Sequence, residues 1–418
     1  MPPALLLARR LMERGHEPLV VSDSANREAA EASGLSFASW DSAPNRQRAG
    51  SSDDPLQDWR SRWPPAIVRS ICGAVISGPS ACYARDTAAL IDRFQPDVVL
   101  SNELLFGCMI AAEARRIPLA LLSANVWCFP TRADVPPFGP AFAPARGRFT
   151  EGRNQSARNW IARLYDVGLS ALNATRASFG LARLAHTLDQ LRSSRLNLLA
   201  TSATFDYGAT SPEPPFLYAG PLLEAPEWAR ERVMPAHSGP EPLILVSFST
   251  AYQNQHSNVA LSIRALARLP VKGLVTLGPA VAAEGLPAAR NVSVVRGASH
   301  ATLLPHCAAL LCHGGHGTLV RALLHGVPVV CKPEIRDQPE NAARLRWHGA
   351  GIRVGPWTGV QGLRSAVERV LADPSYRHRA QRLGTAIRSE TDDGRRAVDA
   401  LCGLGQCNRS VSTASVCS

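Results

Sequence analysis

Apolar residues in the first third of the chain recur in blocks that alternate between helical and strand-like spacing. Leu6, Leu7 and Leu11 share one helix face, and Gly15 ends that pattern. Short apolar runs between such helices predict buried strands. The predicted elements are a helix over residues 2–15, a strand over 19–21, a helix over 87–94, a strand over 97–100, a helix over 110–116 and a strand over 118–122. This alternation is typical of a doubly wound α/β sheet.

The same alternation begins again in the second half of the chain. The predicted elements are a strand over residues 243–249, a helix over 259–269, strands over 273–277, 292–295, 309–312 and 327–331, and a helix that opens at 337–339. A length of 418 residues suits two domains. Two α/β units in tandem predict a cleft near the carboxyl ends of their strands, where ligands usually bind.

Three stretches interrupt the alternation. Residues 41–65 are rich in Ser, Asp, Arg and Pro and predict a surface excursion. Residues 127–150 contain five aromatic residues among prolines and glycines, which predicts either an apolar pocket or a local plug. A proline-rich stretch from residue 211 suggests a linker. The predicted organisation is a first domain over 1–210, a linker over 211–240, a second domain over 241–402 and a disordered tail over 403–418.

Composition narrows the possible classes of protein. With 45% hydrophobic and 19% charged residues, the chain has the composition of a globular protein. Its net charge is +11, but the basic residues are scattered and do not interleave with aromatics, so we expect no nucleic-acid partner. A basic surface leaves open peripheral contact with an acidic membrane. Ten cysteines without metal-ligand spacing, and the lack of a signal-like start, predict reduced thiols and a cytoplasmic protein. The pattern predicts no particular oligomeric state.

The strand predicted over 309–312 runs directly into a glycine-rich turn, His313-Gly314-Gly315-His316-Gly317-Thr318, and then a helix. Glycines let the backbone approach phosphate oxygens, and a helix N-terminus supplies unpaired N–H groups. The sequence is neither a Walker A loop nor a dinucleotide-binding turn. An anion site and an ordinary tight turn with nearby histidines are both compatible with it.

A second polar motif follows the next predicted strand. Asp337 and Gln338 offer a carboxylate and an amide, which can pair with neighbouring sugar hydroxyls. Asp337 also suits a helix N-cap with Pro339 just after it, and the two roles are compatible. A phosphate cradle followed by a hydroxyl clamp predicts a sugar nucleotide as ligand.

These motifs resemble the GT-B superfamily, and within it the bacterial branch of the UDP-glucuronosyl/macrolide-type glycosyltransferases. The matching stretches are residues 8–21, 96–101, 243–250 and 296–354. The resemblance implies an α/β fold with two Rossmann-like domains that face each other across a cleft. It also implies an inverting, metal-independent enzyme whose co-substrate is a nucleotide sugar, without another cofactor. The implied donor diphosphate residues are His313, Gly314, Gly315, Gly317, Thr318, Ser249 and Thr250, and the implied donor sugar residues are Asp337 and Gln338.

The resemblance fails at the first strand of the family, whose following loop holds a histidine base. Residues 2–15 already predict the first helix, so we expect roughly 15 to 20 family residues to have no counterpart here. His16, at the far end of that helix, is no substitute. The family's partner acid falls on Asn102, with Glu103 beside it. Glu103 can accept a proton and is the candidate base, although a surface glutamate at a strand end is equally compatible.

Three hypotheses follow. The first is a glycosyltransferase that moves a sugar from a UDP- or dTDP-sugar to a hydroxyl of a small apolar acceptor, such as a polyketide, terpenoid or lipid. Arg321, which stands where plant relatives keep a ribose-binding glutamate, is compatible with either donor. The second is a catalytically inactive nucleotide-sugar-binding homologue with a regulatory or partner role. The third, a nucleotide-sugar epimerase of the same fold, needs carboxylates that the motifs do not supply.

Overall fold

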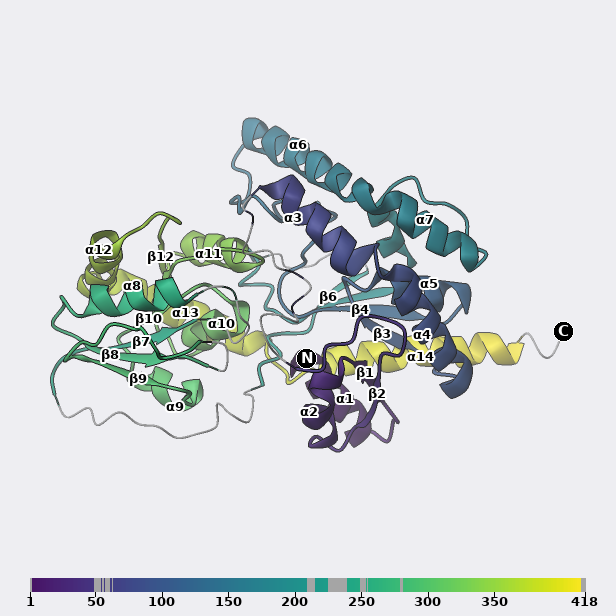
Figure 1. The fold of residues 1–418 in the computed structure, drawn as a ribbon, viewed down its shortest axis with the longest axis horizontal. Helices are drawn as coiled ribbons and strands as arrows, with labels where there is room; N and C mark the ends of the chain where they lie inside the picture. The colour runs from purple at the N-terminus through teal and green to yellow at the C-terminus, as the bar shows by residue number, and fades with distance from the viewer. Residues whose placement is uncertain are drawn as a thin grey trace.

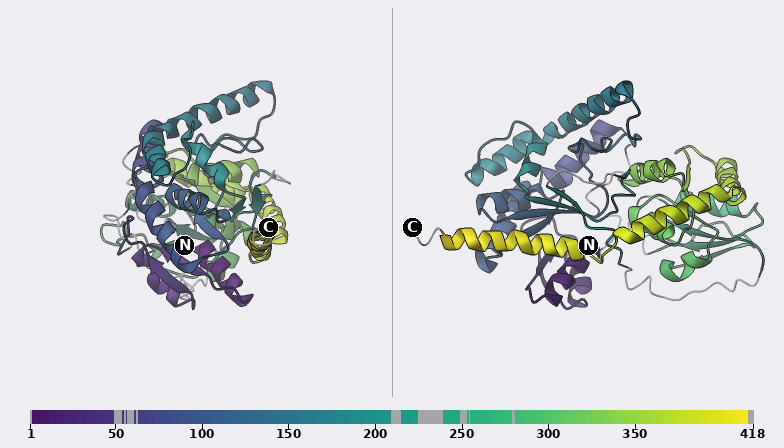
Figure 2. Two further views of the ribbon diagram at one scale, coloured as in Figure 1. Left: turned by 90° about the vertical axis from the view of Figure 1, so that its right-hand side faces the viewer. Right: turned by 180° about the vertical axis from the view of Figure 1, so that it is seen from behind.

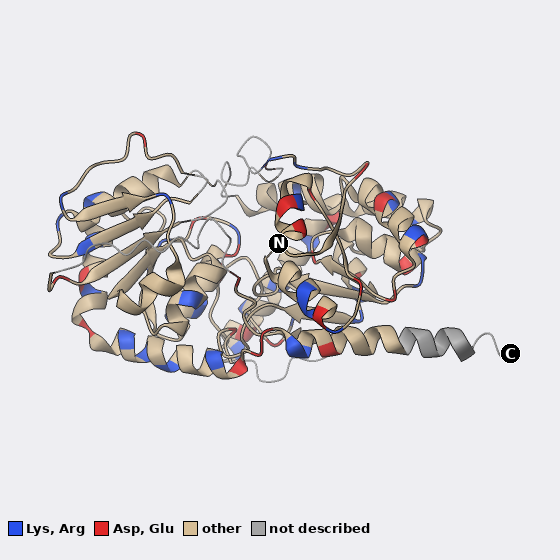
Figure 3. Ribbon diagram, turned by 90° about the horizontal axis from the view of Figure 1, so that it is seen from below, with Lys and Arg blue, Asp and Glu red and all other residues tan. Residues whose placement is uncertain are grey.

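A computed structural model describes residues 2–48, 54, 56, 61, 63–208, 215–224, 239–248, 253, 255–278 and 281–414, of which 407–414 by their backbone only. The chain forms two lobes side by side, each with a parallel sheet covered by helices (Figure 1). The first lobe contains the N-terminal half of the chain, and the second lobe contains most of the remainder. Basic residues are spread over both lobes and interspersed with acidic ones (Figure 3).

The first lobe contains two separate parallel sheets. The larger has the strand order β3-β4-β5-β6, formed by β3 (Val99–Asn102), β4 (Leu119–Ser123), β5 (Leu196–Leu199) and β6 (Phe216–Tyr218). The smaller consists of β1 (Leu19–Ser22) and β2 (Ser36–Ser39). The usual doubly wound order places one more parallel strand between β1 and β3. None of the described residues forms a strand in that place.

Helices cover both sheets of this lobe. They are α1 (Pro2–Glu13), η1 (Ser24–Asn26), α2 (Arg27–Glu31), α3 (Pro64–Ile71), the π-helical η3 (Cys72–Ile76), α4 (Ser80–Phe94), α5 (Phe106–Ala114), α6 (Arg148–Leu164), η4 (Tyr165–Gly168), α7 (Leu169–Ser178) and η5 (Thr187–Ser193). The run Pro64–Phe94 is long and apolar enough to cross a membrane by length and composition alone. Ile76, Ala84 and Ile91 from this run are buried in the core of the lobe.

The second lobe has the strand order β12-β11-β10-β7-β8-β9, a doubly wound arrangement with β7 and β10 at its centre. The strands are β7 (Leu243–Ser247), β8 (Lys272–Thr276), β9 (Val292–Val295), β10 (Ala309–Cys312), β11 (Val329–Cys331) and β12 (Gly351–Arg353). The helices are α8 (His256–Leu266), α9 (His300–Leu303), η7 (Leu304–His306), α10 (His316–Leu324), α11 (Gln338–Trp347), α12 (Val360–Ala372) and α13 (Pro374–Glu390). The apolar runs that predicted β7, β8, β10 and β11 are buried on both faces of the sheet, whereas Ser293 and Val294 of the edge strand β9 are exposed.

The last helix returns to the first lobe, which corrects two predictions. Helix α14 (Arg395–Ala414) follows α13 and runs along the back of the first lobe (Figure 2). Val398 and Leu401 pack against Leu7 and Leu198, so the second domain does not extend to residue 402. The tail predicted to be disordered is helical through Ala414, because Leu404 continues this apolar face.

The predicted linker over 211–240 is also partly wrong. Residues Phe216–Tyr218 form β6, which pairs in parallel with β5 at the edge of the larger sheet. Tyr218 is buried among the residues of that lobe's core. Residues 216–218 therefore belong to the first lobe and do not separate two domains. Much of the remaining predicted linker lies outside the described residues.

Candidate functional site

The topological switch point of the second lobe places the predicted donor motif at the expected ligand crevice. Strands β7 and β10 are adjacent and parallel, with Leu310 opposite Leu245, and the chain leaves them in opposite directions along the sheet. Their carboxyl ends lead to Phe248 and to His313. Ligands of doubly wound sheets bind in this crevice. Ser249 and Thr250, also predicted to border the phosphates, lie outside the described residues.

The protein itself requires two of the glycines after β10. Gly314 has a left-handed φ of +92°, and a Cβ there would lie 2.6 Å from Sγ of Cys331. A Cβ on Gly315 would lie 2.5 Å from Nε2 of His313. Gly317 differs, because the protein atom nearest to a Cβ added at this position would be 3.6 Å away. A Cβ at Gly317 would thus make only ordinary contacts, with Arg321 and Leu223, so the fold itself does not require a glycine there.

The N-terminus of α10 has the features of an anion site. Gly315 is its N-cap and offers no side chain to cap the first turn, which contains Gly317 and the half-buried Thr318. The first amides of an α-helix have no partner within the helix, and the dipole favours negative charge there. This geometry supports the predicted contact of residues 313–318 with a diphosphate.

His313 lies against this helix start in a buried position. Its ring stacks on Phe248 with centroids 6.0 Å apart and an interplanar angle of 25°. Burial lowers the pKa of His313 to about 4, so its imidazole is neutral at neutral pH. Its buried Nδ1 has no hydrogen-bond partner within the described part of the chain. A buried polar atom without a partner is costly, and a donor phosphate oxygen would satisfy it.

The structure brings Asp337 beside the same helix start. Asn341 Nδ2 donates to Oδ2 of Asp337 at 2.7 Å and to the carbonyl of Gly314 at 3.0 Å, which joins the two predicted motifs. Burial raises the pKa of Asp337, while hydrogen bonds from Asn341 and the His316 backbone N–H oppose that shift. The half-buried carboxyl of Asp337 is therefore available at the end of the phosphate cradle.

Gln338 has a more internal role than its motif suggested. It is buried, and its Oε1 accepts hydrogen bonds from the backbone N–H groups of Glu334 at 3.0 Å and Ile335 at 3.3 Å. Its Nε2 donates to Oε1 of Gln253 at 2.6 Å. In this conformation Gln338 holds the loop before α11 and the loop after β7 together. Its contact with a donor sugar stays a prediction, and Gln253 is a neighbour that the sequence did not reveal.

The candidate base lies at the carboxyl end of β3 in the first lobe. Glu103 is buried, and its Oε1 accepts a hydrogen bond from the hydroxyl of Ser123 at 2.9 Å. Asn102 Nδ2 donates to Oε2 at 2.9 Å, and Sγ of Cys128 lies 3.6 Å from Oε1. Burial raises the pKa of Glu103 to about 7, although the Ser123 and Cys128 hydrogen bonds oppose it. A carboxyl group with this pKa suits a general base at neutral pH.

Cys128 lies within electrostatic range of carboxylates from both half-sites. Burial raises the pKa of Cys128, and the carboxylates of Glu103 and Asp337 raise it further. Glu103 belongs to the first lobe and Asp337 to the second, so the Cys128 thiol is influenced by carboxylates of both lobes. In the same region His316 crosses from α10 to the first lobe, with Nε2 2.8 Å from Oγ1 of Thr201. Neither cross-lobe role could be inferred from the spacing of residues in the sequence.

Most aromatic residues described in the stretch over 127–150 pack inside the protein, which favours the predicted local plug over an apolar pocket. Trp127 and Phe129 are buried in the core of the first lobe, and their rings meet edge to face. Phe138 packs against the core of the second lobe. Phe149 is exposed. The stretch therefore joins the lobes, and most of its aromatic surface is used for packing.

Comparisons with known proteins agree with this geometry. Residues 280–392 match the family described as erythromycin biosynthesis protein CIII-like, C-terminal domain. The chain is 29% identical to 4'-demethylrebeccamycin synthase of Lentzea aerocolonigenes over 422 residues, covering 96% of both chains. It is 33% identical to aklavinone 7-beta-L-rhodosaminyltransferase of Streptomyces galilaeus over 181 residues, which cover 42% of this chain and 39% of that one.

Solved structures share the fold over nearly the whole chain. The glycotransferase of kitacinnamycin superposes with a TM-score of 0.73 at 20% identity, covering 96% of this chain and 95% of its own. The glycosyltransferase VinC in complex with DTDP gives a TM-score of 0.69 at 20% identity, covering 97% and 96%. The fold and the sequence relatives together define a GT-B glycosyltransferase. More particularly, the chain is of the bacterial type whose homologues act in natural-product biosynthesis. The predicted fold class and family resemblance are thereby confirmed.

Proposed function

We propose that this glycosyltransferase is inverting and metal-independent, and that it moves a sugar from a UDP- or dTDP-sugar to a hydroxyl of a small apolar acceptor. One observation supports this most directly. The buried Nδ1 of His313, which lacks a partner among the described residues, lies at the start of α10, whose N-cap is a glycine, and Asp337 lies beside it. That arrangement suits a nucleotide sugar, with the diphosphate at α10 and the sugar near Asp337.

The chemistry needs one proton acceptor and one stabiliser of the leaving group. The acceptor oxygen attacks the anomeric carbon of the donor and forms the new C–O bond while the bond to the diphosphate breaks. The hydroxyl proton passes to the carboxylate of Glu103. The α10 amides and the neutral imidazole of His313 stabilise the negative charge on the departing nucleoside diphosphate, so these residues do not require a metal ion for that task.

The relatives and the chemistry of the chain support the remaining parts of the proposal. The VinC structure with DTDP supports a thymidine diphosphate sugar as one donor to test. The names of the homologous transferases support a natural-product acceptor. The eight described cysteines are all free thiols, which favours a cytoplasmic location.

Calorimetry with dTDP and UDP tests the donor site. We expect His313→Ala to weaken binding of the preferred nucleotide by at least about tenfold, since it removes one hydrogen bond to a charged phosphate. His16→Ala, at the end of α1, is the matched control and should bind as the wild type does. Equal affinity of His313→Ala and the wild type would refute the assignment of the diphosphate site.

A donor-binding homologue without transferase activity is the second candidate. It is favoured by the small exposure of Glu103, whose side chain is only 5% accessible and is held by Ser123 and Asn102. Calorimetric binding of a nucleotide sugar would then occur without release of nucleoside diphosphate in the presence of hydroxylated acceptors. Release that depends on acceptor and is lost in Glu103→Gln would exclude it.

A further inference from the structure

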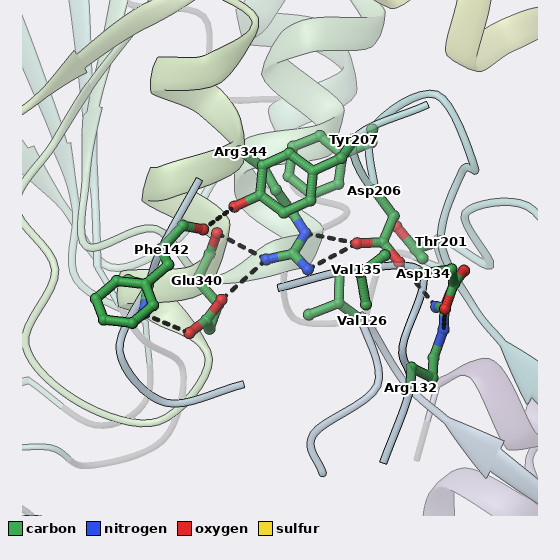
Figure 4. Close-up of polar contacts among 12 residues, drawn as sticks. Val126, Arg132, Asp134, Val135, Phe142, Thr201, Asp206, Tyr207, Glu340 and Arg344 are labelled. Atoms are coloured by element: carbon green, nitrogen blue, oxygen red, sulfur yellow. Dashed lines mark hydrogen bonds and ion pairs between the residues drawn. The ribbon is translucent and has the colours of Figure 1, made fainter. Parts of the chain in front are cut away.

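A single buried carboxylate on α11 holds the loop over 127–150. Glu340 Oε1 accepts hydrogen bonds from the backbone N–H groups of Gly139 at 2.8 Å and Ala141 at 2.7 Å. The Glu340 side chain lies between the loop and Arg344 (Figure 4). Glu340 is only 1% exposed, so water cannot replace these contacts. Backbone N–H groups that converge on one anion form a nest, and here the anion is a side chain from the other lobe.

The loop backbone is strained at the point of contact. Ala141 has a φ of +55°, and Gly139 has a φ of +122°. A left-handed conformation costs an alanine on the order of 1 kcal/mol, and such strain persists only where the surroundings fix it. The hydrogen bonds to Glu340 are the contacts that fix the N–H groups of these residues. Without these hydrogen bonds, we expect the backbone at Ala141 to leave the left-handed conformation.

The other side of the Glu340 carboxylate is fixed as well. Nη1 of Arg344 donates to Oε2 at 3.1 Å, and Nε of Arg344 donates to Oδ1 of Asp206 at 2.8 Å (Figure 4). Asp206 belongs to the first lobe, and the hydroxyl of the adjacent Tyr207 donates to the carbonyl of Phe142 at 2.9 Å. The loop is thus held by Glu340 from the second lobe and by Tyr207 from its own lobe.

Glu340 is placed to connect this loop with the donor side. It lies in the first turn of α11, three residues after Asp337, which lies beside the start of α10. The residues of one helical turn move together, because its backbone hydrogen bonds fix their relative positions. At the other end of the loop, Cys128 contacts Glu103. The loop therefore spans the distance between the first turn of α11 and the candidate base.

We propose that Glu340 is a positioning residue, which couples sugar-nucleotide binding at the start of α11 to the conformation of the loop over 127–150. This inference rests on the proposed function, because it uses Asp337 as part of the donor site. Glu340 acts through the Gly139 and Ala141 amides. Because coupling is reciprocal, a bound donor orders the loop, and an ordered loop favours the donor-bound arrangement.

Hydrogen exchange on the full chain tests the contact itself. In Glu340→Ala, amides in peptides that cover residues 137–143 should exchange about tenfold faster, the effect of losing a hydrogen bond to a charged group. Glu340→Gln keeps an accepting oxygen, so it should show a smaller increase and guards against a folding defect. The exposed Glu368→Ala on α12 is the matched control. Unchanged exchange in folded Glu340→Ala would overturn the proposal.

The coupling is tested with dTDP-glucose and UDP-glucose as probes. We expect the bound probe to slow loop exchange in the wild type but not in Glu340→Ala. Because the coupling is reciprocal, Glu340→Ala should also raise the calorimetric Kd for the probe at least about fivefold, the lower range of allosteric coupling. Absence of probe binding to the wild type would refute the proposed function. Probe binding that slows the loop equally in both proteins would overturn the coupling alone.

Discussion

Ser123 donates a hydrogen bond to Glu103, from the end of one strand to the end of its parallel neighbour, at 2.9 Å. The bond favours the ionised carboxylate, whereas burial favours the protonated form and raises the pKa of Glu103 to about 7. The balance leaves the group half-ionised near neutral pH. A base in this state can accept a proton and release it again within one catalytic cycle.

The pH dependence of transfer follows from this pKa. The base must be ionised, so kcat/KM should rise with pH and level off above about 7. Glu103→Gln should lower kcat by about 10²- to 10⁴-fold, the usual contribution of a general base, with little change in donor Kd. A pH–rate profile and calorimetry check the two parts. A profile without a limb near pH 7, or a fully active Glu103→Gln, would identify another base.

Ser123→Ala tests the hydrogen bond separately. Loss of a donor to the ionised form raises the carboxyl pKa, so the rising limb should move to higher pH. The shift should be up to about one pH unit, because such a bond is worth roughly 1.5 kcal/mol. The plateau rate at high pH should change little, which distinguishes this effect from general damage to the site. Ser193→Ala on η5 serves as a control, and a limb that stays in place would count against the assignment.

The ion pairs of Asp206 lead to a prediction of how the free energy of unfolding changes at acid pH. Its buried carboxylate pairs with Arg344 at 2.7 Å and Arg132 at 3.0 Å, and these cations lower its pKa even though burial opposes them. A lowered folded-state pKa contributes stability above the ordinary value of 3.8, and this contribution is lost as pH falls below it. Asp206→Asn leaves both arginines undercompensated and should cost about 3 to 5 kcal/mol.

Urea unfolding at several pH values measures this contribution. The difference between the wild type and Asp206→Asn should be constant from pH 7 to about 5 and should shrink below about pH 4. Asp399→Asn, which removes an exposed partner of Arg14, should change stability by less than about 1 kcal/mol. A difference that grows as pH falls would contradict the assigned direction of the Asp206 pKa shift.

Local pattern predicted β1, β3 and β4 of the first lobe and β7 to β11 of the second, because each is a short apolar run bounded by residues that break regular structure. It did not predict β2, β5 or β12. The phosphate cradle stays a prediction, and the sequence could suggest it because residues 313–318 are contiguous. The contact between Glu340 and Gly139 joins residues 201 positions apart, and neither residue type signals the other. Strand β6 and the end of α14 were missed because prolines and glycines near them suggested loops, whereas tertiary packing of Tyr218 and Leu404 decides their structure.

Alanine substitutions at Gly315 and Gly317 can separate a glycine that the fold requires from a glycine that ligand binding requires. A Cβ on Gly315 would meet His313 at 2.5 Å, so Gly315→Ala should destabilise the fold and disturb the donor site together. A Cβ on Gly317 would come no closer than 3.6 Å to a neighbouring side chain. Alanine is also favoured over glycine inside a helix by roughly 0.5 to 1 kcal/mol. Gly317→Ala should therefore match or exceed the wild type in thermal stability. If a diphosphate approaches this backbone closely, the same variant should bind dTDP or UDP at least about tenfold more weakly, by analogy with glycines of other phosphate-binding turns. Unchanged nucleotide affinity in stable Gly317→Ala would place the diphosphate away from the first turn of α10.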